Sequence, residues 1–144
     1  MRYVFGAFGR APDRMKRIVS TGDAPAAVGA YSQATTNGDL LFTAGQLPLT
    51  AEGDLLDEEP VSIQTEQCME NVAAVLAAEG LSLGDVLKTT IYLDDIDDFD
   101  EMNGTYAGFF EEAPPARSAV EVGGVPKGAA VEIEVVADAS GTGE

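Results

Sequence analysis

The spacing of apolar residues predicts strands in both halves of the chain. Residues 31–36 and 40–46 flank an Asn37-Gly38 pair, and Asn-Gly between two extended segments strongly favours a β-hairpin. Residues 86–93 are rich in β-branched and aromatic side chains, which fit the half-buried surface of a sheet. We therefore predict a hairpin followed, after an intervening segment, by a longer strand.

Two further strands are predicted near the end of the chain, at residues 116–122 and 130–137. Side chains alternate between the two faces of a strand, so the sequence also predicts which residues lie together. One face of the last strand carries Val131, Ile133 and Val135, and the other carries Glu132 and Glu134. In the strand before it, Arg117, Ala119 and Glu121 share a face.

A first helix is predicted at residues 62–79, after the polar segment 50–60, which we expect to be a loop. Ser62 is expected to cap its start, and Gly80 follows where a left-handed residue commonly ends a helix. Helical spacing forms one apolar stripe from Cys68, Val72, Val75 and Leu76. Cys68 is therefore interpreted as a small core residue and not as a nucleophile.

A second helix is predicted after the acidic segment 94–101. The acids there lack the spacing of a calcium loop and instead complement the positive N-terminal end of a helix. The apolar stripe consists of Phe99, Met102, Tyr106, Phe109 and Phe110. We interpret that stripe as core packing, and we expect Pro114-Pro115 to stop the helix.

The order of these elements is strand, hairpin, helix, strand, helix, strand, strand. The economical arrangement is an α+β fold in which two helices pack on one face of a mixed six-stranded sheet. Residues 15–139 are expected to form a single domain, with a flexible tail or upstream start at residues 1–14 and a short tail at 140–144. The polar faces of the last two strands remain for solvent or for neighbouring subunits.

Composition excludes several kinds of chemistry. The chain has 144 residues, no His, no Trp and one Cys. Without histidine there is no Ser-His-Asp triad, no Cys-His pair and no imidazole metal ligand. A single cysteine excludes an internal disulfide, a C-x-x-C redox motif and a thiolate zinc cage. The side chains left for catalysis are Asp, Glu, Tyr, Lys, Arg and hydroxyls, together with backbone N–H groups.

The charge is strongly negative and unevenly distributed. Residues 1–17 carry five basic residues against one acid, a net charge of +4, whereas residues 18–144 carry three against 24, a net charge of −21. Because proteins neutralise phosphates with clustered Lys and Arg, nucleic-acid binding is not expected. Such an acidic composition favours adaptation to high salt over a merely acidic protein in ordinary salt.

No apolar stretch approaches the roughly 20 residues needed to cross a membrane. The first residues also lack the continuous apolar core of a signal peptide. The low cysteine count fits a reducing compartment. We therefore expect a cytoplasmic protein that does not bind membranes.

Arg117 is the only arginine after residue 17. Its guanidinium can hold a carboxylate through two parallel hydrogen bonds, which makes it a candidate anchor for an acidic substrate. The alternative is a structural ion pair with Glu121, Glu132 or Glu134. Composition alone does not separate these two interpretations.

Three other residues are candidates for chemistry. Glu132 lies between two apolar residues, where a carboxylate can have a raised pKa and exchange a proton with water, although its position alone favours a solvated surface glutamate like Glu134. Tyr31 can donate a hydrogen bond or pack at the base of the hairpin. Gly45 permits close approach of a ligand or marks a bulge.

Several segments, in this order, resemble the Rid family, also called YjgF-like. The similarity covers residues 16–138, and the P-A-R-S-x-V strand followed by V-E-I is highly specific to the family. The segments are A-P-A-A-V-G-A-Y-S-Q (24–33), L-F-T-A-G-Q-L-P (41–48), Q-C-M-E-N-V (67–72), G-D-V-L-K-T-T-I-Y-L (84–93), N-G-T-Y-A-G-F-F (103–110), P-A-R-S-A-V-E-V (115–122) and V-E-I-E (131–134).

The resemblance implies a chorismate-mutase-like fold, a homotrimer with sites in clefts between subunits, and no metal or organic cofactor. The implied activity is hydrolysis of reactive 2-imino acids, or their enamine tautomers, to 2-oxo acids and ammonia. Arg117 matches the arginine that holds the substrate carboxylate, and Glu132 matches the glutamate that positions water. The remaining pocket positions of the family fall on Tyr31, Gly45 and Asn103.

Two positions depart from the family pattern. Ala119 stands where many members carry cysteine, so only its backbone N–H can bind a ligand, and Ala44 replaces a common hydroxyl residue. Two other functions stay open. One is a trimer that binds small carboxylates without turnover, and the other is the ribonuclease or translation-inhibitor role of some relatives, which the acidic charge disfavours.

Overall fold

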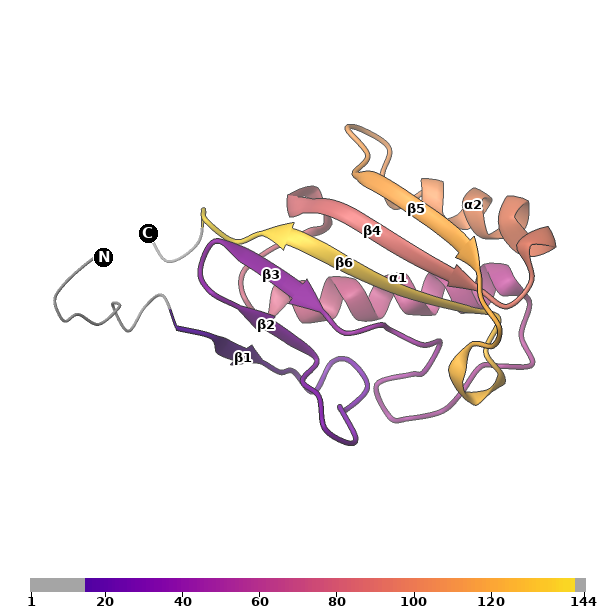
Figure 1. Ribbon diagram of the computed structural model, residues 1–144, viewed down its shortest axis with the longest axis horizontal. Coiled ribbons are helices and arrows are strands. Elements are labelled where there is room, and N and C mark those ends of the chain that lie inside the picture. The colour runs from indigo at the N-terminus through magenta and orange to yellow at the C-terminus, as the bar shows by residue number, and fades with distance from the viewer. Residues whose placement is uncertain (1–14, 142–144) are drawn as a thin grey trace, which may run out of the picture.

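The computed structural model describes residues 15–141 and contains a six-stranded sheet and two α-helices (Figure 1). The proposed tail at residues 1–14 and residues 142–144 lie outside this range. The strands are β1 (Arg17–Val19), β2 (Ala34–Thr36), β3 (Leu40–Thr43), β4 (Val86–Leu93), β5 (Ala116–Glu121) and β6 (Val131–Asp138). The helices are α1 (Val61–Ala77) and α2 (Phe99–Ala107), and short 3-10 turns lie at Leu83–Asp85, Ile96–Asp98 and Pro126–Gly128.

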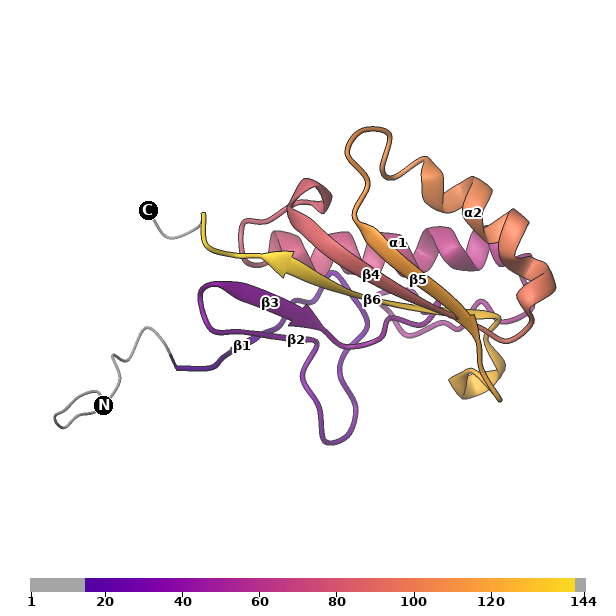
Figure 2. The same ribbon diagram turned by 45° about the horizontal axis from the view of Figure 1, so that its top comes forward.

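The sheet is mixed, as predicted. Its strand order is β1-β2-β3-β6-β4-β5, and every neighbouring pair is antiparallel except β4 and β5. Parallel neighbours need a crossover connection, and α2 supplies it between β4 and β5. This crossover makes β5 an edge strand and places α2 alongside it (Figures 1 and 2).

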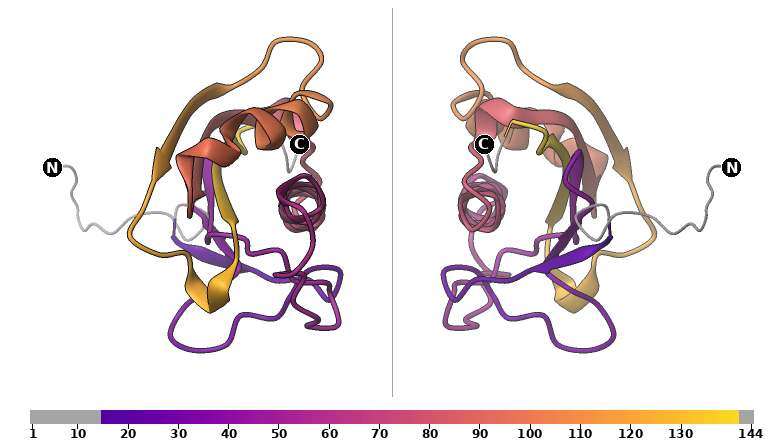
Figure 3. Two further views of the ribbon diagram at one scale, coloured as in Figure 1. Left: turned by 90° about the vertical axis from the view of Figure 1, so that its right-hand side faces the viewer. Right: turned by 90° about the vertical axis from the view of Figure 1, so that its left-hand side faces the viewer.

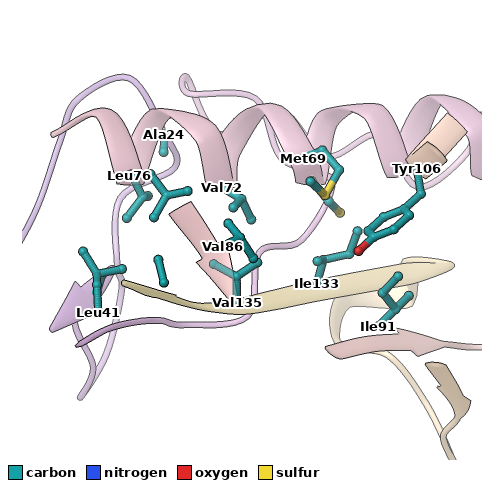
Figure 4. Packing of buried hydrophobic residues seen from close by; sticks show 14 of the residues in the cluster. Ala24, Leu41, Met69, Val72, Leu76, Val86, Ile91, Tyr106, Ile133 and Val135 are labelled. Atoms are coloured by element: carbon teal, nitrogen blue, oxygen red, sulfur yellow. The ribbon is translucent and has the colours of Figure 1, made fainter. Parts of the chain in front are cut away.

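Both helices cover the same face of the sheet, which confirms the predicted α+β arrangement (Figure 3). Met69, Val72 and Leu76 of α1 face Ile133 and Val135 of β6 across the core (Figure 4). The predicted alternation in β6 is correct, because its apolar face is buried while its two glutamates lie on the opposite face. That opposite face is covered by no helix of the described chain, and we call it the open face.

The hairpin and the end of α1 form for the predicted reasons. Asn37 accepts hydrogen bonds from the Asp39 and Leu40 N–H groups through its side chain, and Gly38 takes the left-handed conformation that the turn requires. Gly80 also has a positive φ, and the Leu81 N–H then donates back to the Leu76 carbonyl. This is the glycine-ended helix stop expected from the sequence.

Two predicted helix boundaries were wrong. Helix α1 begins at Val61 with Pro60 as its cap, and the Ser62 N–H donates to the Glu101 carboxylate instead of Ser62 capping the helix. Helix α2 ends at Ala107, well before the two prolines. The N–H groups of Phe109 and Phe110 bond three residues back, so the chain tightens into turns there while both rings still pack against the core.

Cys68 lies in the core, as predicted. It is fully buried, and its thiol contacts the Val131 carbonyl. Burial raises the pKa of the thiol far above its ordinary value, so Cys68 stays protonated. In residues 15–141 no helix has the length and apolar character that a membrane crossing requires.

Candidate functional site

Arg117 is the second residue of the edge strand β5, and its side chain lies on the helix-covered face, opposite Thr89 in the register of β4 and β5. Its Nη1 donates a 2.6 Å hydrogen bond to the Asn103 side-chain oxygen. Its guanidinium carbon lies 5.0 Å from the ring centre of Tyr106 and 5.2 Å from that of Phe99. Helix α2 therefore holds Arg117 by one hydrogen bond and two cation–π contacts.

The Tyr106 ring that contacts Arg117 is held in place by the core. Tyr106 is buried, and its hydroxyl lies 2.7 Å from the Thr89 hydroxyl, which is also buried. Burial raises the pKa of Tyr106, so this hydroxyl is neutral and can share the hydrogen bond. The guanidinium thus rests on a surface that the core keeps in place.

Arg117 has no acidic partner among residues 15–141. The three acids that could have formed a structural ion pair lie elsewhere: Glu121 accepts a hydrogen bond from the Ile96 N–H, and Glu132 and Glu134 occupy the open face. Among residues 15–141, the structure thus rules out the alternative of a structural ion pair between Arg117 and any of these three glutamates. The remaining N–H groups of the guanidinium are available for an external anion.

The guanidinium opens onto a pocket of about 370 Å³. Arg117 and Asn103 are its polar groups, and its other walls are Tyr106, Ala107, Phe110, Pro114 and Pro115. Apolar walls with a few directed polar groups are the usual composition of a small-molecule site. The pocket suits a small carboxylate with an apolar remainder.

Ala119 lies two residues along the same face as Arg117, opposite Ile91, and its side chain packs against the core. The Val122 N–H points inward to the Leu93 carbonyl of β4. Because N–H groups alternate in direction along a strand, those of Arg117 and Ala119 point to the free edge. The edge therefore offers backbone donors next to the guanidinium.

Glu132 lies on the open face of β6 and is half-buried. Burial raises the pKa of its carboxyl, and the neighbouring charge of Glu134 raises it further. Gly45 faces it directly, since a Cβ at that position would collide with the Glu132 carboxylate. Reciprocal backbone hydrogen bonds between Gln46 and Ile133 hold the two segments together.

Tyr31 lies in the loop before β2, and 54% of its surface is exposed. A small pocket next to it is also lined by Gly45 and Gln46, so Tyr31 shares a pocket with the glycine that adjoins Glu132. The loop is held by Gln33, whose side chain bonds the Thr21 N–H and the Pro25 carbonyl. Tyr31 is therefore not packed away at the base of the hairpin.

The predicted site residues fall into two groups. The first group, which we call the arginine half-site, consists of Arg117, Asn103 and Ala119. The second group, the glutamate half-site, consists of Tyr31, Gly45 and Glu132. Within one chain Arg117 and Glu132 lie on opposite faces of the sheet. Among the described residues, no three His, Cys, Asp or Glu side chains are grouped so that they could hold a metal ion.

Comparison with known proteins identifies sequences related to this chain. A family model described as Endoribonuclease L-PSP matches residues 21–139. A RutC family protein from Pyrococcus horikoshii is 46% identical over 123 residues, covering 85% of this chain and 98% of the relative. The 2-iminobutanoate/2-iminopropanoate deaminase of Salmonella typhimurium is 42% identical over 126 residues, covering 85% and 98%.

Solved structures agree with these relatives. YyfA from Yersinia pestis, of the conserved Rid protein family, has a TM-score of 0.83 and 40% identity, covering 86% of this chain and 99% of that one. The chain belongs to the Rid family. Another solved structure, Escherichia coli TdcF with bound serine, has a TM-score of 0.81 and 37% identity, covering 85% of this chain and 98% of that one.

Sequence reasoning missed the residues that support Arg117. Phe99 and Tyr106 were assigned to the core, yet both also carry the guanidinium. They lie four residues before and three residues after Asn103, so all three share one helix face. That spacing could have shown that the Rid-family asparagine and the two rings form one surface.

Proposed function

We propose that this Rid protein hydrolyses 2-imino acids, or their enamine tautomers, to 2-oxo acids and ammonia. The observation that carries the proposal is Arg117, a guanidinium held over two aromatic rings at a small pocket, with no acidic partner among the described residues. The related deaminase of Salmonella typhimurium supports the choice of reaction.

Arg117 would hold the substrate carboxylate through its free N–H groups, as guanidinium groups commonly do. Asn103 fixes the orientation of the guanidinium, and the edge N–H of Ala119 lies where it can donate to the same anion. Holding one end of the substrate leaves the imine carbon, C2, in a defined position. The serine bound to TdcF is likewise a small carboxylate-bearing molecule and supports this class of ligand.

Glu132 would activate the water that attacks C2. In the first step the water oxygen bonds to C2 while the second electron pair of the C2=N bond moves to nitrogen, and Glu132 takes one water proton and passes it to that nitrogen to give a carbinolamine. In the second step Glu132 takes the proton of the C2 hydroxyl and passes it to the amino nitrogen, the C2–N bond breaks, and ammonia leaves as the C2=O bond of the 2-oxo acid forms. A carboxyl with a raised pKa can accept and return protons in this sequence. Tyr31 would donate a hydrogen bond in the same pocket.

A site with both groups requires two copies of the chain, because Arg117 and Glu132 lie on opposite faces of one sheet. The open face also exposes Ile18, Phe42 and Val120, apolar side chains that association would cover. Together with the resemblance to Rid proteins, this supports a homotrimer with sites at its three subunit interfaces.

The test is ammonia release from 2-iminobutanoate and 2-iminopropanoate generated in the assay, measured at high salt against the spontaneous rate. We expect the protein to accelerate hydrolysis and Arg117→Ala to remove most of the acceleration. Lys16→Ala, which removes one exposed cation remote from the site, is the matched control. No acceleration by the unmodified protein, together with tight binding of 2-oxo acids, would instead establish a carboxylate-binding protein.

The family description also raises ribonuclease activity. The acidic body disfavours it, because residues 18–144 carry only three basic side chains with which to contact phosphates. RNA cleavage by homogeneous protein that disappears in Arg117→Ala would support that activity instead.

A further inference from the structure

Glu132 lies in a group of polar residues on the open face, together with Glu134, Tyr92 and Thr90. Glu132 and Glu134 are two positions apart on β6, so their side chains leave the same face. In the register of β4 and β6, Tyr92 lies opposite Glu132, and Thr90 lies opposite Glu134. Tyr92 is therefore next to both carboxylates.

Tyr92 is engaged with only one of these carboxylates. Burial raises the pKa of Tyr92, and the charge of Glu134 and its hydrogen bond with the hydroxyl raise it further. Glu132 acts on Tyr92 only through its charge. The register thus places the Tyr92 side chain beside Glu134, while the Glu132 carboxylate lies against Gly45.

The surroundings of Glu132 contain little positive charge. Tyr92 faces it from β4, Glu134 adjoins it on β6, and the segment at Gly45 contributes no titratable group. The thiol of Cys68 on α1 senses the Glu132 charge from the other face of the sheet but remains protonated. Lys88 shares the open face but pairs in register with Val136, and no described residue forms an ion pair with Glu132.

We propose that Glu134, oriented by the Tyr92 hydroxyl on the same face, is a positioning residue for the Glu132 carboxylate two positions away on β6. The proposal rests on the function proposed above, since it assigns Glu132 to proton transfer. Glu134 would not touch the substrate. It would act through Glu132, by like-charge repulsion across two positions of one strand.

The arrangement suits both steps of the reaction. A stronger acceptor takes the proton from the attacking water more readily, and the resulting carboxylic acid can return a proton to the departing ammonia. A single carboxylate at its ordinary pKa would be a weaker base for the first step. Glu134 thus increases the basicity of the Glu132 carboxylate without itself contacting the substrate.

The experiment compares Glu134→Gln with the unmodified protein and with Glu66→Gln, which removes one exposed acid on α1. The pH dependence of kcat/KM and the titration of the Glu132 carboxyl by ¹³C NMR are both measured. In Glu134→Gln we expect the acid limb and the titration midpoint to move to lower pH by about half a unit or more. Glu66→Gln is expected to leave both unchanged.

Two further variants separate charge from structure. Glu134→Asp keeps the charge and should restore the unmodified profile. Tyr92→Phe frees the Glu134 carboxylate and should move the acid limb in the same direction as Glu134→Gln, by a smaller amount. An unchanged Glu132 titration in folded Glu134→Gln would overturn the proposal. Because the titration does not require turnover, it decides this proposal even if the deaminase assay fails.

Discussion

Asn103 and Arg117 lie on consecutive elements of one crossover unit, and the asparagine oxygen accepts a 2.6 Å hydrogen bond from the guanidinium. The bond orients Arg117 without neutralising it, because an amide carries no charge. An aspartate in the same place would compete with any anion that binds from outside.

This hydrogen bond predicts that two substitutions of Asn103 weaken substrate binding to different extents. Asn103→Ala removes the orienting bond, and we expect the KM for 2-imino acids to rise about tenfold, since hydrogen bonds to charged groups contribute about 1.5–3 kcal/mol. Asn103→Asp should weaken binding of 2-oxo acids more, because it supplies an internal counter-charge. Steady-state kinetics measure the KM for 2-imino acids, and calorimetric titration with a 2-oxo acid compares the affinities of the two variants. Equal affinity in the two variants would contradict a role for charge.

Gly45→Ala tests the contact between Gly45 and Glu132. The added methyl collides with the Glu132 carboxylate, so the side chain must turn away from the pocket. A displacement of about 1 Å at a reacting group can lower the rate about 100-fold, and we expect a loss of that order in kcat. The thermal midpoint should change little. The control is Gly104→Ala on α2, where the added methyl meets only open space, and we expect it to leave kcat unchanged. Gly53 is unsuitable as a control because its φ is positive.

Glu132→Gln is expected to stabilise the fold at neutral pH while abolishing activity. Burial raises the pKa of Glu132 in the folded state, so folding favours the protonated form. The unmodified protein is therefore penalised once the pH rises through that raised pKa, and the penalty is absent below about pH 4, where the unfolded carboxyl is also protonated. Denaturant unfolding of both proteins at pH 7 and pH 4 measures the difference, which should shrink at the lower pH.

Ionic strength is expected to control assembly. Each chain carries a net charge of −17, so the proposed trimer carries −51. Self-repulsion of this size is screened at high salt and acts over longer distances at low salt. We expect dissociation or unfolding below moderate salt, measured by light scattering and by thermal midpoints in a KCl series. An intact trimer in dilute buffer would show that the acidic surface does not require salt.

The sequence was sufficient where local chemistry determines the structure. The β-branched run gave β4 its observed bounds, Val86–Leu93, and the Asn37-Gly38 pair fixed the hairpin. Local signals misled at Ser62, because Pro60 occupies the cap position and α1 starts one residue before Ser62. The three-residue strand β1 was expected only as a position in the order, since so short a segment has no periodicity of its own.

The site was predictable as a set of residues but not as an arrangement. Alternation placed Arg117 with Ala119, and it separated Glu132 from Val131 and Ile133. The crossover that brings Asn103 beneath Arg117 depends on how α2 packs on β4 and β5, which no local pattern encodes. The engagement of Tyr92 with Glu134 likewise follows from the register of β4 on β6.

Because Arg117 and Glu132 lie on opposite faces of the sheet, two inactive variants are expected to complement each other when each site takes its arginine from one copy and its glutamate from another. Arg117→Ala and Glu132→Gln chains, unfolded together and reassembled in equal amounts, would restore about a quarter of the sites by random mixing. Recovered turnover in such a mixture, absent from either parent alone, would identify the subunit boundary as the place where the reaction occurs.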